Sequence, residues 1–188
     1  MTRTRYYTAM SLDGYLADAD GSLDWLLTLT DAGTEGGFAS FLDGIGAFAM
    51  GATTYEWVLA HDPLLEHPER WQRMYGDRPS WVFTHRELPR IPGADIRFVS
   101  GDVRPVHREM VRAAGERDVW LVGGGPLAGA FADAGLLDEL QLSVAPVLLA
   151  GGAPLLPRRL EGRLRLTDAR VAGVFAELRY EVDPPPPA

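Results

Sequence analysis

Residues 119–134 read VWLVGGGPLAGAFADA, and this stretch decides the fold class. The apolar residues 119–122 are typical of a buried strand, and they run directly into three glycines at 123–125. A helix is expected over 127–134, and Pro126 suits its first turn, where the missing N–H costs nothing. A strand that turns straight into a helix is the unit from which parallel sheets are built. The stretch therefore predicts an α/β protein.

The same alternation extends to both sides of this stretch. Strands are predicted over 6–10, 47–50, 81–84, 96–99 and 140–145, and helices from Ser22, over 53–59 and over 106–114. Residues 11–21 are expected to form a loop, and residues 63–79 a polar excursion with at most two helix-like turns. Two alternating runs, 164–171 and 174–182, flank Ala172–Gly173, which predicts a two-residue hairpin turn.

The predicted architecture is one α/β domain over residues 1–183. It has a mixed, mostly parallel central sheet flanked by helices, and it ends in an antiparallel hairpin. Four consecutive prolines cannot join a sheet or helix, so residues 184–188 are predicted to be a disordered tail.

Composition excludes several classes of function. Of the 188 residues, 18 are basic and 26 acidic, which gives a net charge of −8, and all the basic residues are arginine. Without lysine or cysteine there is no Schiff base, no P-loop lysine, no thiolate catalysis and no disulfide. The acidic balance argues against a nucleic-acid partner. No apolar run is long enough to span a membrane, and residues 1–10 carry no signal-peptide core, so we expect a cytoplasmic protein. We also expect no metal site.

Three strand-to-helix turns carry groups suited to phosphate. Glycines let the backbone approach an anion, and N–H groups at a helix start face it. The glycines at 123–125 have this form, although a tight turn without a ligand is the alternative. In FAMGATTYE (48–56), Gly51 precedes Thr53 and Thr54, with plain N-capping by threonine as the alternative. In WVFTHR (81–86), a hydroxyl, an imidazole and a guanidinium stand in a row, and the alternative is a solvated loop. Together the three turns meet the demand of a dinucleotide such as NADPH.

The segment AMSLDGYLA (9–17) ends the first predicted strand in a polar turn. Asp13 has three readings: a catalytic acid, a substrate hydrogen-bond acceptor, or the aspartate of an ordinary Asp-Gly turn. A proton-donating Asp13 requires burial that raises its pKa. Tyr15, Trp25 and Trp57 offer flat rings for stacking on an aromatic substrate, with packing in the core or on the surface as the alternative, and core packing is favoured for Trp57.

In this order, AMSLDG, MGATTYE, VFTHR, VWLVGGGPLAGAF, LDELQLSVAPVLLAGGAPLLP and LRYEV resemble the dihydrofolate-reductase-like superfamily. They resemble more closely the stand-alone relatives of the riboflavin-biosynthesis reductase domain (RibD C-terminal domain). The resemblance covers residues 5–182. It implies a single α/β domain that binds NADPH and delivers hydride to a small pterin-like or pyrimidine-like substrate. It also implies a homodimer paired through the sheet edge.

The resemblance also assigns residues to roles. The nicotinamide is expected to be lined by Ala9, Leu16 and Ala17. The pyrophosphate is expected to be held by Gly51, Thr53, Thr54, Gly123, Gly124, Gly125 and Leu127. The 2′-phosphate is expected at Thr84, His85 and Arg86. Ser11 and Asp13 are the expected catalytic residues beside the hydride-accepting ring, and Tyr15 and Trp25 the expected substrate contacts.

The chain departs from these families at two positions. Ala52 stands where dihydrofolate reductases commonly carry arginine, which leaves His85 and Arg86 to select NADPH over NADH. Tyr15 stands where riboflavin reductases often carry lysine, so one cation for a phosphorylated ribose is missing. Two rival hypotheses therefore stay open: a non-catalytic dinucleotide- or ligand-binding protein that kept the fold, and a structural dimer. Three acids lie in the region of the folate-binding carboxylate, in surroundings unlike those of the folate enzymes: Asp24, Asp31 and Glu35.

Overall fold

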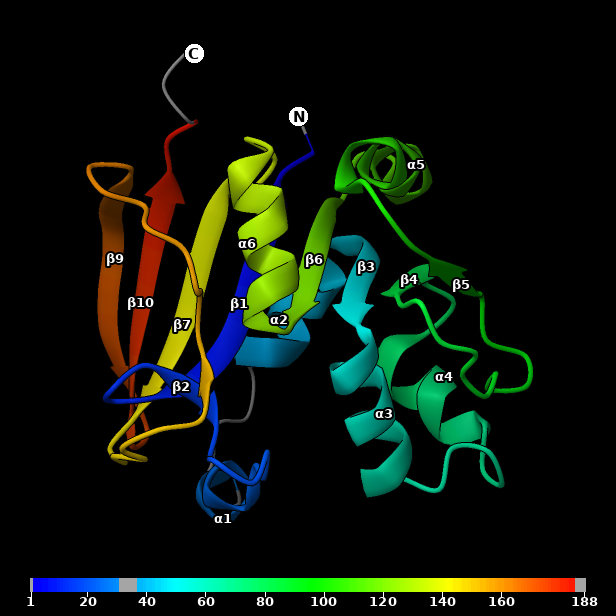
Figure 1. Cartoon of the computed structure of the whole chain (residues 1–188), viewed down its shortest axis with the longest axis horizontal. Helices are drawn as coiled ribbons and strands as arrows, with labels where there is room; N and C mark the ends of the chain where they lie inside the picture. Colours follow the sequence, from blue (N-terminus) through cyan, green and yellow to red (C-terminus); the bar gives the residue numbers. More distant parts are fainter. Residues whose placement is uncertain (1, 31–36, 185–188) are drawn as a thin grey trace.

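The computed structural model describes residues 2–30 and 37–184, and within them strands and helices alternate along the chain (Figure 1). The strands are β1 (Thr4–Ser11), β2 (Tyr15–Ala17), β3 (Ile45–Gly51), β4 (Ser80–Phe83), β5 (Ile96–Val99), β6 (Asp118–Gly123), β7 (Glu139–Ala145), β8 (Ala153–Pro154), β9 (Leu164–Ala172) and β10 (Phe175–Val182). The helices are α1 (Asp24–Thr30), α2 (Gly37–Asp43), α3 (Ala52–His61), α4 (Glu69–Tyr75), α5 (Val103–Ala114) and α6 (Gly125–Asp133).

Eight strands form one sheet in the order β5-β4-β3-β6-β1-β7-β10-β9, and β2 pairs with β8 in a separate ribbon. The pairs from β5 to β7 are parallel, whereas β10 runs antiparallel to both β7 and β9. The mixed, mostly parallel sheet with a C-terminal hairpin is therefore confirmed. The hairpin turn lies at Gly173–Val174, because Phe175 pairs with Ala172, so the turn predicted at Ala172–Gly173 is one residue too early.

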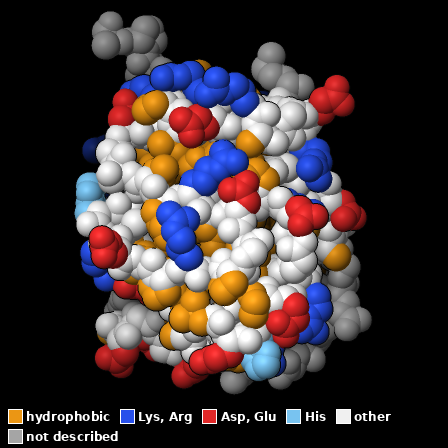
Figure 2. All heavy atoms as spheres, turned by 90° about the vertical axis from the view of Figure 1, so that its right-hand side faces the viewer, with side chains coloured by type: hydrophobic (Ala, Val, Ile, Leu, Met, Phe, Trp, Pro, Cys, Tyr) orange, Lys and Arg blue, Asp and Glu red, His pale blue; other side chains and the backbone are white. Residues whose placement is uncertain are grey.

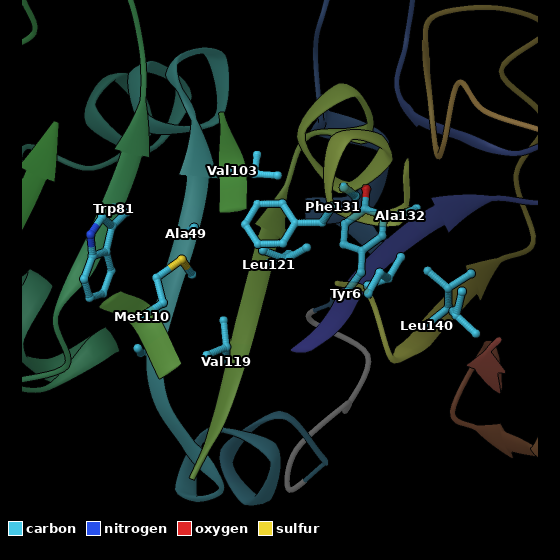
Figure 3. Close-up of a cluster of buried hydrophobic side chains, with 14 of the residues drawn as sticks. Tyr6, Ala49, Trp81, Val103, Met110, Val119, Leu121, Phe131, Ala132 and Leu140 are labelled. Carbon is cyan, nitrogen blue, oxygen red and sulfur yellow. The ribbon is translucent and has the colours of Figure 1, made fainter. Parts of the chain in front are cut away.

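Helices cover both faces of the sheet, α6 on one and α2 on the other (Figure 1). Strand β3 is buried along nearly its whole length, which explains its unbroken apolar sequence IGAFAM. Close packing on α5 also explains Gly46, since a Cβ there would lie 2.4 Å from the carbonyl oxygen of Ala114. Figure 3 shows Tyr6, Leu121 and Phe131 in the cluster of apolar side chains beneath α5 and α6.

An aromatic cluster fills the opposite face of the sheet. Phe48 and Trp120 from the strands meet Phe41 of α2 and the fully buried Trp71 of α4. Within the excursion predicted over 63–79, α4 supplies the helix-like turns, and its burial against this cluster was not predicted. The prediction of a loop over 11–21 is also incomplete, since this segment contains β2, which pairs with β8. Helix α2 was not predicted from the sequence.

The parallel strands bring their carboxyl ends to one edge of the sheet, where α3 follows β3 and α6 follows β6 directly. Functional groups in such sheets gather at this edge. Figure 2 shows the face on the β5 side of the molecule, where acidic and basic side chains are interspersed. In the described part of the chain, no helix is long and apolar enough to cross a membrane. Of the predicted tail, residues 185–188 lie outside the described residues.

Candidate active site

The turn after β6 lies against the start of α3. Strands β3 and β6 are neighbours, and Met50 stands opposite Gly123. A Cβ built on Gly51 would lie 3.8 Å from the backbone nitrogen of Gly124, and one built on Gly123 would lie 3.4 Å from Oγ1 of Thr54. Residues that were singled out in two motifs some 70 positions apart therefore form one surface, as the dinucleotide hypothesis requires.

Both helices at this surface begin with a glycine at the N-cap. Gly51 precedes α3 and Gly124 precedes α6, and neither helix start has a side-chain cap among the described residues. Helix α5 differs, because the Asp102 carboxylate accepts a hydrogen bond from the backbone N–H of Arg104. The alternative of plain threonine N-capping is therefore wrong for α3. Uncapped first-turn N–H groups at the positive end of a helix dipole suit an anion.

The three consecutive glycines differ in their surroundings. The nearest atom to a Cβ on Gly124 would be Cδ of Pro126 at 3.9 Å, which is an ordinary van der Waals contact. Gly123 has a backbone φ of +154°, which residues with a side chain rarely adopt. A Cβ on Gly125 would lie 2.4 Å from the carbonyl oxygen of Pro154. The backbone of Gly124 is therefore less crowded than that of Gly125, which is required for contact with the chain at β8.

The remaining member of the predicted pyrophosphate group, Leu127, is partly buried and packs against the apolar cluster beneath α6. Thr53 is exposed and Thr54 partly buried in the first turn of α3. The structure thus brings five of the seven predicted residues to one surface and directs Gly125 and Leu127 towards packing contacts. The five are Gly51, Thr53, Thr54, Gly123 and Gly124.

The predicted 2′-phosphate residues follow the end of β4, next to β3. The Thr84 hydroxyl accepts a hydrogen bond from the backbone N–H of Arg86 at 2.9 Å, and this contact closes a tight turn. The Arg86 guanidinium donates two hydrogen bonds of 2.8 Å to the carboxylate of Glu56 on α3. His85 is exposed. A cation therefore lies at this strand end, as predicted, but it is paired with a carboxylate that was not predicted.

Asp13 is an anchor between two loops. Its carboxylate accepts hydrogen bonds from the hydroxyl of buried Ser11 at 2.6 Å and from the backbone N–H groups of Leu149 and Ala150. Ser11 also accepts a hydrogen bond from the backbone N–H of Tyr15 at 2.9 Å. The hydrogen bond from Ser11, followed by those from Ala150 and Leu149, lowers the pKa of Asp13 below its ordinary value. Asp13 is also exposed, so the burial and raised pKa that a proton donor requires are both absent.

The predicted nicotinamide and substrate residues lie on β1, β2 and α1. Ala9 stands opposite Ser143 of β7, and Tyr15 and Ala17 pair with β8. Trp25 of α1 is partly buried, and its indole nitrogen has no hydrogen-bond partner among the described residues. Leu16 lies between Tyr15 and Ala17 and is partly buried.

Four further side chains that the sequence singled out have different outcomes. Trp57 stacks on His61 with ring centroids 4.7 Å apart, and it is partly buried on α3. Asp24 is exposed at the start of α1. Asp31 and Glu35 lie outside the described residues. Asp24 therefore provides no buried carboxylate at the site.

Two carboxylates near the site were not predicted from the sequence. Glu56 holds Arg86, and Glu177 of β10 is buried beside Ser143 of β7, whose hydroxyl donates a hydrogen bond of 2.5 Å to it. In the sequence, Glu177 alternates with Leu178 and Tyr180 and so resembles an ordinary solvent-facing strand position. Among residues 2–30 and 37–184, no group of three acidic or histidine side chains is placed to hold a metal ion.

Comparisons with known proteins agree on one family. The model of the RibD C-terminal domain matches residues 4–175. The chain is 29% identical over 95% of its length to the uncharacterized protein YwjB of Bacillus subtilis, of which it covers 97%. It is 45% identical over 84% of its length to the riboflavin biosynthesis protein RibD of Corynebacterium ammoniagenes, of which it covers 47%. The chain thus spans about half the length of such RibD proteins.

Solved structures show the same fold. A putative riboflavin biosynthesis protein from Shewanella sp. PV-4 is 25% identical with a TM-score of 0.76, and the match covers 97% of this chain and 99% of that one. A dihydrofolate reductase from Enterococcus faecalis complexed with NADP(H) is 15% identical with a TM-score of 0.57, and the match covers 95% and 94% of the two chains. The second likeness concerns the fold alone.

Proposed function

The chain belongs to the RibD C-terminal domain family, and from this premise we propose that it is an NADPH-dependent reductase of a small pterin-like or pyrimidine-like substrate. The observation that carries the proposal is the surface where the uncapped starts of α3 and α6 meet at the carboxyl ends of β3 and β6. Two adjacent helix starts with an approachable backbone at Gly124 suit a pyrophosphate.

The proposed binding mode follows the carboxyl edge of the sheet. Gly51, Thr53, Thr54, Gly123 and Gly124 bind the pyrophosphate, while Thr84, His85 and Arg86 face the 2′-phosphate. Ala9, Leu16 and Ala17 line the nicotinamide, which supplies the hydride when bound. The protein's share is to orient the two rings and exclude water.

On the substrate side, Tyr15 and Trp25 are proposed to contact the ring. Ser11 and Asp13 act in this proposal as positioning residues, because ionised Asp13 ties the loop after β1 to the loop after β7. The proton that accompanies hydride transfer is therefore not assigned to Asp13.

The proposal includes a homodimer formed through the sheet edge and a cytoplasmic location. Strand β9 supports the dimer, because nearly all its residues are exposed and its outer edge pairs with no described strand. The sequence departures at Ala52 and Tyr15 favour the second candidate function, a binding protein that kept the fold without turnover.

The first experiment is a tryptophan-fluorescence titration of the full chain with NADPH and with NADH. We expect saturable binding of NADPH that is tighter than that of NADH. Gly124→Asp places a negative charge at the proposed pyrophosphate site and is expected to abolish binding. Gly44→Asp is the matched control, since Gly44 precedes β3 at the opposite, amino edge of the sheet.

The outcomes separate the hypotheses. If neither nucleotide binds, or if Gly124→Asp binds like the wild type, the cofactor site is refuted. If NADPH binds, its oxidation in the presence of pterin and pyrimidine acceptors distinguishes a reductase from a binding protein without turnover.

A further inference from the structure

A row of side chains lies on the face of the sheet that turns away from α6. Ala9, Ser143 and Glu177 stand directly opposite one another on β1, β7 and β10, and Arg170 continues the row on β9. Directly paired residues project to the same face of a sheet. The next residue along β7, Leu142, packs instead in the cluster beneath α6. The row is therefore separate from the core on the α6 side.

Glu177 is the exceptional member of this row. It is only 8% exposed, and its Oε1 accepts a hydrogen bond of 2.5 Å from the Ser143 hydroxyl. Its Oε2 is buried and has no hydrogen-bond partner among the described residues. Buried polar atoms in folded proteins nearly always have partners, and an unpaired carboxylate oxygen is costly to bury. A hydrogen-bond donor on a ligand explains why this atom is kept without one in the protein.

The donors that neighbour Glu177 form no hydrogen bond with its Oε2 in the described part of the chain. Ser143 has a single hydroxyl proton, which is committed to Oε1. Burial raises the pKa of the Tyr7 phenol, and its contact with Ser143 opposes this shift. Arg179, two positions along β10, lies on the same face as Glu177, but its buried Nε has no hydrogen-bond partner among the described residues and lies 3.7 Å from Glu139 Oε1. Arg170 stands opposite Glu177 on β9, and in the described part of the chain no ion pair joins the two. Oε2 is therefore an acceptor that no described side chain uses.

The row also joins this acceptor to the proposed hydride-transfer site. Ala9 is the proposed nicotinamide contact, and neighbouring strands are about 4.8 Å apart. Glu177 thus lies two strand spacings, about 10 Å, from Ala9 along the row. A carboxylate side chain and a six-membered ring together span such a distance.

We propose that Glu177 is a substrate-binding residue whose Oε2 accepts a hydrogen bond from an N–H at the edge of a heteroaromatic ring. The ligand class is an aminopyrimidine or a fused ring with an aminopyrimidine edge, placed beside Ala9. This inference rests on the proposed function for the position of the nicotinamide, but the carboxylate itself belongs to the described structure.

The test compares two probes on the full chain by calorimetry, with and without NADPH. Diaminopyrimidine carries N–H donors, and dimethoxypyrimidine with the same substitution pattern carries none. We expect only diaminopyrimidine to bind the wild type well. Glu177→Ala is expected to weaken its binding about 10- to 100-fold, the range for a hydrogen bond to a charged group. Glu177→Gln keeps an acceptor oxygen without the charge and should bind with intermediate affinity.

Glu181→Gln is the matched control, because Glu181 lies on the same strand but is ion-paired with Arg3 and Arg165. It is expected to bind diaminopyrimidine like the wild type. A melting temperature of Glu177→Gln no lower than that of the wild type is also expected, because glutamine keeps an oxygen for the Ser143 hydroxyl and Oε2 has no described partner to lose. A marked fall, or wild-type affinity in folded Glu177→Ala, overturns the inference.

Nucleotide binding is measured separately by fluorescence without the pyrimidine. If the wild type binds NADPH but not diaminopyrimidine, the role of Glu177 is refuted while the proposed function stands. If diaminopyrimidine binding depends on Glu177 but NADPH does not bind, the substrate site stands and the proposed reductase function fails.

Discussion

Arg86 and Glu56 form a two-pronged ion pair that joins the end of β4 to α3, with both nitrogen–oxygen distances at 2.8 Å. The pair lies at the strand end proposed for the 2′-phosphate. The Glu56 carboxylate therefore takes up the Arg86 N–H groups that a phosphate would bind, and its negative charge repels the phosphate. Since Ala52 offers no cation there, discrimination between NADPH and NADH is expected to depend on the balance between Arg86 and Glu56.

Glu56→Gln is expected to tighten NADPH binding about three- to tenfold and to leave NADH binding unchanged, because one competing charge is removed. Stability should change little, since both side chains are well exposed and such pairs contribute about 0–1 kcal/mol. Nucleotide titration by fluorescence measures both affinities. Asp95→Asn is the control, because it removes an exposed partner of Arg97 at the amino end of β5. Equal NADPH affinity in the two variants would contradict the prediction.

The adjacent glycines 124 and 125 should respond oppositely to alanine. Gly124→Ala has room for its Cβ, so we expect a stability within about 0.5 kcal/mol of the wild type but roughly tenfold weaker NADPH binding. Gly125→Ala would force its Cβ against the backbone at Pro154 and Leu155, which should cost about 1–3 kcal/mol. Denaturant unfolding and nucleotide titration check the pair. The assignment fails if Gly124→Ala is the less stable variant.

The sequence predicted most of the parallel sheet because β3, β4 and β6 carry runs of apolar residues and β7 alternates apolar and polar residues. It could not predict that Gly51 and Gly124 meet, because their contact follows from β3 lying next to β6, a pairing of distant segments. The short ribbon of β2 and β8 has too few residues for a periodic pattern. Glu177 was overlooked because its partner Ser143 lies 34 positions away on another strand.

Helix α4 lies in a segment whose polar sequence predicted an excursion with at most two helix-like turns, yet it completes the aromatic cluster. Trp71 is 1% exposed and its ring centroid lies 4.5 Å from that of Tyr75. Trp71→Ala is therefore expected to cost about 3–5 kcal/mol in the free energy of unfolding. Trp57→Ala is the comparison, because Trp57 is partly buried and stacks on His61, and its loss should cost clearly less. Urea unfolding of both variants measures the difference, and similar costs would refute a structural role for α4.

Asp13 provides the last test, because a lowered pKa is expected of a carboxylate that anchors a loop and a raised pKa of one that donates a proton. A lowered pKa means that the ionised carboxylate stabilises the folded state at neutral pH and that this contribution fades as pH falls from the ordinary value of 3.8 through the lowered one. Asp13→Asn should therefore be less stable than the wild type at pH 7 and differ little in strong acid. Hydrogen exchange should quicken at the amides of Leu149 and Ala150, which Asp13 holds. Asp20→Asn changes the aspartate of a neighbouring Asp-Gly pair, at 20–21, and should leave these amides unchanged. Unchanged exchange in Asp13→Asn itself would reject the anchor and restore a chemical role for this carboxylate.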